Sequence, residues 1–270
     1  MDAEQNMSLE QLFQQIEQSE WIDIPQGWLQ GRTIFGGLVA GMLIHKAIAI
    51  IADAEKKLLS CSITFVGPVE HDKVKVTAEI LRQGKSVTTI EVRLWQNDAV
   101  QSILIASFGS QRESNIQVAL EPQAPDFPSL DQINIVPKYL PFPECVKNFQ
   151  LAWTEGNYPM SASKQPDFSG WCRFDPAEHT DREMTIADLL TLMDVWPPGV
   201  LSMFRKPAPA STLTWHVTFI HPLQHGLNDW FKYKVMTDYA EHGYATEHAY
   251  LWDEQNRLIA IARQTVTVFA

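Results

Sequence analysis

The sequence has few basic residues and no apolar run long enough to cross a membrane. Among 270 residues, 21 are Lys or Arg and 32 are Asp or Glu, which gives a net charge of −11. So acidic a chain is poorly suited to nucleic acid as a general partner. No run of 18 or more apolar residues and no basic-then-apolar leader is found, which predicts neither a membrane span nor a signal peptide. We therefore expect a cytoplasmic protein that binds neither nucleic acid nor membrane.

Cysteine is scarce, and the common motifs of hydrolases are absent. Cys61, Cys145 and Cys172 form no CxxC pair or metal-ligand spacing, which suits a reducing compartment and predicts no metal site. The sequence contains no GxSxG, GxxxxGK[ST] or HExxH motif. Serine-type hydrolysis, nucleotide hydrolysis and zinc proteolysis therefore lack support, and we expect no cofactor.

What the chain does have is a strongly apolar segment preceded by glycines. From Leu38 to Ala52 only two polar residues interrupt a series of apolar or small ones. A helix that is apolar all round is buried all round, and about 15 residues are too few to span a membrane. We expect a central helix wrapped by the rest of the chain. Gly36 and Gly37 at its start serve either close packing or the approach of a ligand, beside unpaired N–H groups that favour an anion.

Strand patterns bounded by turn residues follow this helix and return in the second half. In the first half we predict a short helix opened by a capping box at Ser8–Gln11, and then, after the buried helix, strands at 58–66, 73–82, 86–95 and 99–108. In the second half we predict short strands at 149–153 and 169–174, a helix from a capping box at Thr180–Glu183 to Trp196, and strands at 211–220, 230–239, 243–252 and 258–269.

The two halves share residues as well as order. Residues 63–69 (ITFVGPV) match residues 217–223 (VTFIHPL), Leu94–Trp95 matches Leu251–Trp252, and Ile105–Ala106 matches Ile261–Ala262. We therefore predict an α+β fold with two helix-plus-antiparallel-sheet repeats in one chain. Residues 1–115 would form the first repeat, the proline-rich residues 116–144 a connector, and residues 145–270 the second repeat.

This arrangement resembles the double hotdog fold of the thioesterase II type of acyl-CoA thioesterases, in which sheets wrap long central helices. The resemblance rests on residues 31–37 (GRTIFGG), 192–198 (LMDVWPP) and 211–215 (STLTW), together with Gln264. It implies an enzyme that hydrolyses acyl-CoA by means of an Asp, a Thr or Ser and a Gln that position a water. Those positions fall on Asp194, Thr212 and Gln264, in the second repeat. The family's habit of further association also implies a homo-oligomer.

The residues by themselves favour Asp194 as a candidate general base. It lies near a helix C-terminus at the margin of the apolar face, whereas Asp188 is expected to point the opposite way. Partial burial and the helix dipole both disfavour a negative charge there, and a residue kept at such a cost is a candidate for function. The other interpretation is that Asp194 only accepts hydrogen bonds at the helix end.

Strand alternation separates the other two candidates. Gln264 alternates with Ala262 and Val266, so its amide is expected to point into the interior, toward a water, a substrate or the backbone. Under the internal repeat Gln264 matches Phe108, which predicts a single competent site. Thr212 shares the less apolar face of its strand with Thr214 and His216, so it serves only if that strand end faces the junction of the repeats. Thr214 and His216 remain substitutes for it.

The expected chemistry is direct attack of water on the thioester carbonyl. Gly37 and Leu38, with Gly36 beside them, are candidates for the N–H groups that would stabilise the oxyanion. We expect an apolar channel between sheet and helix for the acyl chain. Basic residues for the CoA phosphates are available at Arg32, Arg82, Lys85, Arg205 and Lys206. Two alternatives stay open: a non-catalytic acyl-CoA- or lipid-binding protein, and a hotdog hydratase that would use Asp175 and His179.

Overall fold

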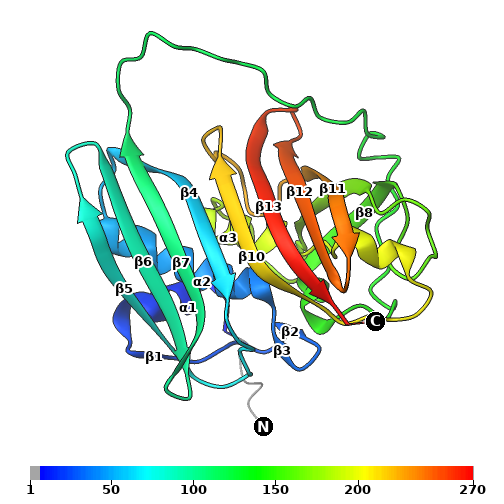
Figure 1. The fold of residues 1–270 in the computed structure, drawn as a ribbon, viewed down its shortest axis with the longest axis horizontal. Helices are drawn as coiled ribbons and strands as arrows, with labels where there is room; N and C mark the ends of the chain where they lie inside the picture. The colour runs from blue at the N-terminus through cyan, green and yellow to red at the C-terminus, as the bar shows by residue number, and fades with distance from the viewer. Residues whose placement is uncertain (1–6, 270) are drawn as a thin grey trace.

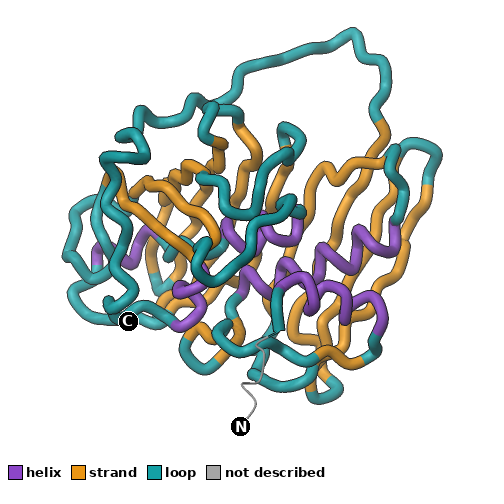
Figure 2. The backbone as a smooth tube through the Cα atoms, turned by 180° about the vertical axis from the view of Figure 1, so that it is seen from behind, coloured by secondary structure: helices purple, strands orange, loops and turns teal. Residues whose placement is uncertain are grey.

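The sheet of this protein is continuous through both halves of the chain. The structure, a computed structural model, describes residues 7–269, so residues 1–6 of the predicted first repeat and Ala270 of the second lie outside the described part. Eleven antiparallel strands form one sheet in the order β1-β5-β6-β7-β4-β10-β13-β12-β11-β9-β8. The helices lie on one face of this sheet (Figures 1 and 2). The predicted α+β class with helix-plus-sheet repeats is confirmed.

The first half contains two helices and most of one side of the sheet. Its elements are α1 (Leu9–Gln18), β1 (Trp21–Ile22), β2 (Leu29–Gln30), β3 (Thr33–Ile34), α2 (Gly36–Ile51), β4 (Lys56–Phe65), β5 (Val74–Gln83), β6 (Val87–Gln96) and β7 (Ala99–Ser110). The predicted capping box is present, because Ser8 and Gln11 each bond the other's backbone N–H. The apolar helix α2 is buried along most of its length, as its composition requires.

The second half repeats this order with a shorter central helix. Its elements are η1 (Glu144–Asn148), β8 (Phe149–Glu155), β9 (Phe168–Phe174), α3 (Ile186–Met193), η2 (Gly199–Met203), β10 (Ala210–Phe219), β11 (Phe231–Glu241), β12 (Tyr244–Asp253) and β13 (Leu258–Val268). Eight residues make α3 much shorter than the predicted helix, which was to reach from Thr180 to Trp196.

The start of α3 differs from the prediction because an extended segment comes first. Glu183 forms a β-bridge with Gly226, which holds the residues after Thr180 away from helical geometry. The capping box is formed instead by Thr185 and Asp188. Asp188 does not point to solvent, as we expected, but is fully buried and paired with Arg182 at 2.8 Å. A carboxylate at that depth is tolerated because it caps a helix start and meets a cation.

A pseudo-two-fold axis relates the halves at the junction of β4 and β10. There Ser62 pairs with His216, and each is the other's counterpart in the internal repeat. A bulge between Leu94 and Trp95 of β6 recurs between Leu251 and Trp252 of β12, so these counterparts are confirmed.

The same bulges correct our alignment of the last strand of each repeat. Leu94 pairs with Ser102, and Leu251 pairs with Ala260, so Ser102 corresponds to Ala260. Counting four residues along each strand, Gln264 corresponds to Ala106 and not to Phe108. The predicted asymmetry remains, because an apolar residue of the first half still stands where the second half has an amide.

The central helices meet at small residues. A Cβ on Gly41 would lie 2.4 Å from Oγ1 of Thr191, and one on Gly37 would lie 2.8 Å from its carbonyl oxygen. Both positions therefore need glycine for this close crossing of α2 and α3. One hydrophobic cluster extends through both halves around these helices.

The connector runs along the outside of the second half. Residues 111–143, all within the described part of the chain, form no helix or strand, and Figure 1 shows them arching from β7 to the far end of the sheet. Trp171 and Trp252 donate their indole N–H groups to the carbonyls of Pro128 and Pro122. Within residues 7–269, no helix is long and apolar enough to cross a membrane.

Candidate active site

Asp194 lies at a point where the two halves of the chain meet. It follows the last residue of α3 as the C-cap, and its carboxylate faces the start of α2 in the other half. The N–H of Gly37 donates a hydrogen bond to this carboxylate. A Cβ on Gly36 would lie 2.9 Å from Oδ2, so only glycine permits this approach.

Burial dominates the ionisation of this carboxyl group. It raises the pKa of Asp194 from 3.8 to about 7, against the smaller lowering effect of the Gly37 hydrogen bond. The start of a helix favours an anion, because its first N–H groups are unpaired and its dipole is positive there. Asp194 therefore exchanges a proton near neutral pH, which is what a general base requires.

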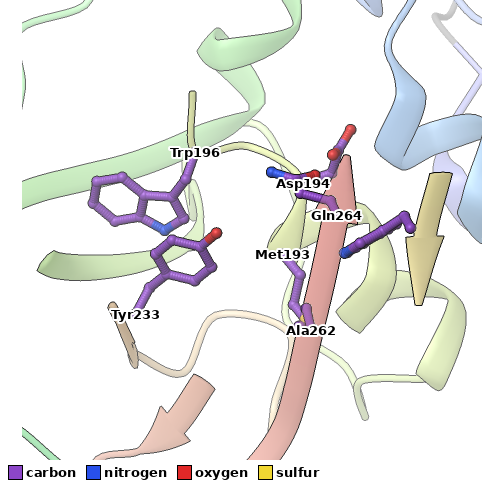
Figure 3. Close-up of a pocket in the computed structure, with 7 residues that line it drawn as sticks. Met193, Asp194, Trp196, Tyr233, Ala262 and Gln264 are labelled. Atoms are coloured by element: carbon purple, nitrogen blue, oxygen red, sulfur yellow. The ribbon is translucent and has the colours of Figure 1, made fainter. Parts of the chain in front are cut away.

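A small cavity lies beside Asp194 and Gln264. It is lined by Met193, Asp194, Trp196, Trp215, Tyr233, Ala262 and Gln264, and Figure 3 shows all but Trp215 labelled around it. About 10 Å³ is open to the centre of a water molecule, which is room for about one water. Two of the three sequence candidates are thus brought to one site.

The third candidate, Thr212, does not line the cavity but bonds to a residue that does. Its hydroxyl donates to Oε1 of Gln264 at 3.5 Å, a long contact. Our assignment of Thr212 to the less apolar face is wrong, because a bulge between Thr212 and Thr214 shifts the alternation by one residue. The bulge places Thr212 opposite Val266, on the same side of the sheet as Gln264.

Glu247 is a functional candidate that our sequence reasoning missed. It lies on β12 directly opposite Gln264, is 1% exposed, and accepts a hydrogen bond from Nε2 of Gln264. The N–H of Gly199 donates to its other oxygen at 3.0 Å. Burial raises the pKa of Glu247 to about 7. Alternation along β12, where Ala245, Glu247, Ala249 and Leu251 share the buried face, is the signal that could have found it.

Aromatic side chains close the cavity on one side. Tyr233 stacks on Trp196 with ring centroids 5.4 Å apart, and Trp153 packs edge-on against Trp196. Burial raises the pKa of Tyr233 well above 10, and the negative charges of Glu247 and Asp194 add to this, so its hydroxyl keeps its proton. The apolar channel that we expected here is not open, because these rings and Trp215 fill the space to the size of one water.

The three N–H groups that are candidates for stabilising the oxyanion differ in their hydrogen-bond partners. That of Leu38 donates to the carbonyl of Phe35, and that of Gly37 donates to Asp194. Gly36 is the first residue of α2, so its N–H has no partner within the helix.

Three further residues with reactive side chains are held in structural roles. Cys145 is close enough to Asp194 to sense its charge, yet burial raises the pKa of its thiol to about 12, which disfavours a thiolate nucleophile. Asp175, considered for a hydratase, bonds to Gln150 and Lys138, and His179 bonds to Asn148 and packs against Phe174. Neither lines the cavity beside Asp194.

Comparison with family models decides the family. Residues 24–109 match the acyl-CoA thioesterase N-terminal domain, and residues 117–268 match the acyl-CoA thioesterase C-terminal domain. The chain belongs to the acyl-CoA thioesterase family. The resemblance inferred from the sequence is therefore confirmed. No curated protein matches this family member in sequence.

Solved structures show that this acyl-CoA thioesterase family member has the hotdog fold. A protein of unknown function with a hot dog fold from Alicyclobacillus acidocaldarius is 21% identical, with a TM-score of 0.81 over 93% of this chain and 92% of that one. The acyl-CoA thioesterase II TesB2 from Mycobacterium marinum is 18% identical, with a TM-score of 0.64 over 87% and 89%. The tesB protein of Mycobacterium avium subsp. paratuberculosis is 16% identical, with a TM-score of 0.70 over 88% of each chain.

Proposed function

We propose that the protein hydrolyses the thioester of an acyl-CoA to a free acid and CoA. Family membership supports the reaction class. The observation that carries the proposal is the meeting of Asp194 and Gln264 at a cavity with room for about one water, where burial brings the pKa of Asp194 to about 7.

The proposed mechanism is general-base catalysis without a covalent intermediate. Asp194 takes a proton from the water as the water oxygen attacks the thioester carbon, while Gln264, whose amide oxygen accepts a hydrogen bond from Thr212, fixes the water's orientation. The carbonyl oxygen becomes negative in the tetrahedral intermediate. We assign the N–H of Gly36 to this oxygen, because the first turn of α2 leaves it without an intrahelical partner. The carbon–sulfur bond then breaks, and the proton held by Asp194 passes to the CoA sulfur.

Substrate binding must displace part of the aromatic wall. The cavity holds a water but not an acyl group, so Tyr233, Trp196 or Trp215 has to move when a thioester reaches Asp194. The exposed basic residues Arg205 and Lys206, which follow η2, are candidates for the CoA phosphates, as are Arg32, Arg82 and Lys85.

Release of free thiol from a panel of acyl-CoAs tests the proposal. Asp194→Asn should lower kcat by about 10²- to 10⁴-fold, because the base is lost while the shape is kept. Asp238→Asn is the matched control and should leave the rate unchanged, since this exposed carboxylate of β11 pairs with Arg263 of β13 and does not line the cavity. Binding of acyl-CoA without thiol release, unaffected by Asp194→Asn, would indicate the non-catalytic binding protein instead.

A further inference from the structure

The amide of Gln264 is held from two sides by groups of different kinds. Its nitrogen donates to Glu247, and its oxygen accepts from the hydroxyl of Thr212. Above its pKa of about 7, the ionised carboxylate of Glu247 only accepts hydrogen bonds, so it admits the nitrogen end of the amide and rejects the oxygen end. Glu247 is itself fixed by the N–H of Gly199, which occupies its second oxygen.

The orientation of this amide matters to the proposed reaction. Rotation by half a turn would exchange the oxygen and the nitrogen while leaving the shape unchanged. The hydroxyl of Thr212 would then lose its acceptor. A water in the cavity would meet a hydrogen-bond donor of the amide where it now meets an acceptor, and the reverse. A side chain that is correct in shape can thus still be wrong in hydrogen bonding.

The fold itself does not require a carboxylate at this position. The shared bulges of β6 and β12 make Ile90 the counterpart of Glu247, and Ala106 the counterpart of Gln264. Ile90 is fully buried in the first half. The repeat therefore packs with apolar residues at both positions, and the polar pair is present only in the half that carries Asp194.

We propose that Glu247 is a positioning residue that sets the direction of the Gln264 amide, so that the amide oxygen faces Thr212. This inference rests on the proposed thioesterase function for its catalytic consequence. It goes beyond the Asp, Thr and Gln of that proposal by adding a fourth residue that touches no reacting atom. Two other ionisable groups lie near Glu247: the charge of Asp167 acts on Glu247, and the charge of Glu247 acts on Tyr233, whose hydroxyl stays protonated.

Glu247→Gln is the decisive variant because it reverses the hydrogen-bonding pattern at nearly constant shape. The N–H of Gly199 needs an acceptor, so the new amide turns its oxygen to Gly199 and its nitrogen toward Gln264. Gln264 must then rotate to offer its oxygen. We expect kcat to fall about 10- to 100-fold, with KM changed less than about threefold and Tm not lowered. Glu91→Gln, on β6 of the first half where Glu91 pairs with Arg93, is the control and should keep the wild-type rate.

The exchanged pair Glu247→Gln with Gln264→Glu provides a rescue. In this double variant the residue at 247 donates to a carboxylate at 264, and that carboxylate can accept from Thr212. It should be at least about tenfold faster than Glu247→Gln alone, because the direction of the hydrogen bonds is restored. A wild-type kcat in Glu247→Gln, or a loss of kcat that follows a loss of Tm and is not rescued, would overturn the proposal.

A second readout does not depend on turnover. The side-chain amide protons of Gln264, assigned by their absence in Gln264→Glu, should be strongly deshielded in the wild type by the bond to Glu247. They should shift upfield in Glu247→Gln, and unchanged amide signals would refute the positioning role. If the wild-type protein releases no thiol from any acyl-CoA, the proposed function fails while this test of the amide's direction still stands.

Discussion

Asp194 and Glu247 are carboxyl groups whose pKa values are raised to about 7 chiefly by burial. Within residues 7–269, the groups that favour their charged forms are the N–H groups of Gly37 and Gly199 and the amide of Gln264, with no positive side chain among them. Structural ion pairs look different, as Asp188 with Arg182 shows. Desolvated carboxylates without a cation reduce stability, so the presence of Asp194 in the cavity lining and of Glu247 behind Gln264 favours a catalytic role for the site.

The free-energy cost of removing the charged Asp194 carboxylate from water predicts that the stability difference between wild type and Asp194→Asn depends on pH. The pKa of Asp194 is about 7 in the folded protein and 3.8 without burial. At pH values between about 4 and about 7, Asp194 holds a proton in the folded protein but not in the unfolded chain. The contribution of Asp194 to the free energy of unfolding therefore declines as the pH rises through this range. Asn carries no charge, and the variant should be more stable than the wild type at pH 8 by about 1–4 kcal/mol.

Urea unfolding at pH 8 and pH 5 measures this difference. The stabilisation of Asp194→Asn should be largest at pH 8 and should shrink at pH 5, where Asp194 of the wild type is mostly protonated. An equal difference at both pH values would contradict the assignment of the raised pKa to Asp194.

At the scale of single elements, the sequence predicted the strands well and the second helix poorly. Alternating residues and turns located β4 to β7 and β10 to β13 to within about two residues, because local pattern alone determines such meanders. The start of α3 could not be predicted, since Thr180 and Thr185 both begin a capping-box pattern. The choice between them depends on the bridge from Glu183 to Gly226, a contact between distant residues.

The two threonines give a direct test of where α3 begins. Thr185→Ala should lower the free energy of unfolding by about 1–2 kcal/mol, because it removes the cap of α3 and a donor to buried Asp188. Thr180→Ala should change it by less than about 0.5 kcal/mol, since Thr180 is exposed. Urea denaturation of both variants makes the comparison, and a larger effect at Thr180 would place the helix start where the sequence pattern first suggested.

The site was less predictable than the strands, because it too depends on contacts between residues that are distant in the sequence. Asp194 and Gln264 were found through the family resemblance, with support from helix position and alternation. We predicted the wrong strand face for Thr212, because a bulge shifts the alternation by one residue. This bulge depends on the pairing of β10 with β13. The alternation that predicted a buried Gln264 also predicts a buried Glu247. That these two residues lie opposite each other on β12 and β13 is seen only in the structure.

At the scale of the whole molecule, the two repeats share one sheet and one core. β4 pairs with β10 across the junction, α2 packs on α3, and the main hydrophobic cluster includes residues of both halves. Neither repeat can lose its structure without exposing apolar surface of the other, so the halves are expected to unfold together.

Comparison of two spectroscopic probes during urea unfolding tests this expectation. Far-UV circular dichroism reports both halves, whereas tryptophan fluorescence is weighted to the second, which holds six of the nine tryptophans. The two transitions should coincide in midpoint. A fluorescence change that precedes or follows the loss of secondary structure by a clear interval of urea concentration would show that the repeats unfold separately.

The bond from Gly37 to Asp194 has a consequence for how this chain can change over generations. The first repeat contributes to the carboxylate through a main-chain N–H, which no amino-acid replacement other than proline can delete. The side chains of the first repeat at the positions of Glu247 and Gln264, Ile90 and Ala106, are buried and apolar, and the close approach of Asp194 needs only the two glycines. One copy of a duplicated unit can in this way support the site of the other copy through its main chain, without a reactive side chain of its own.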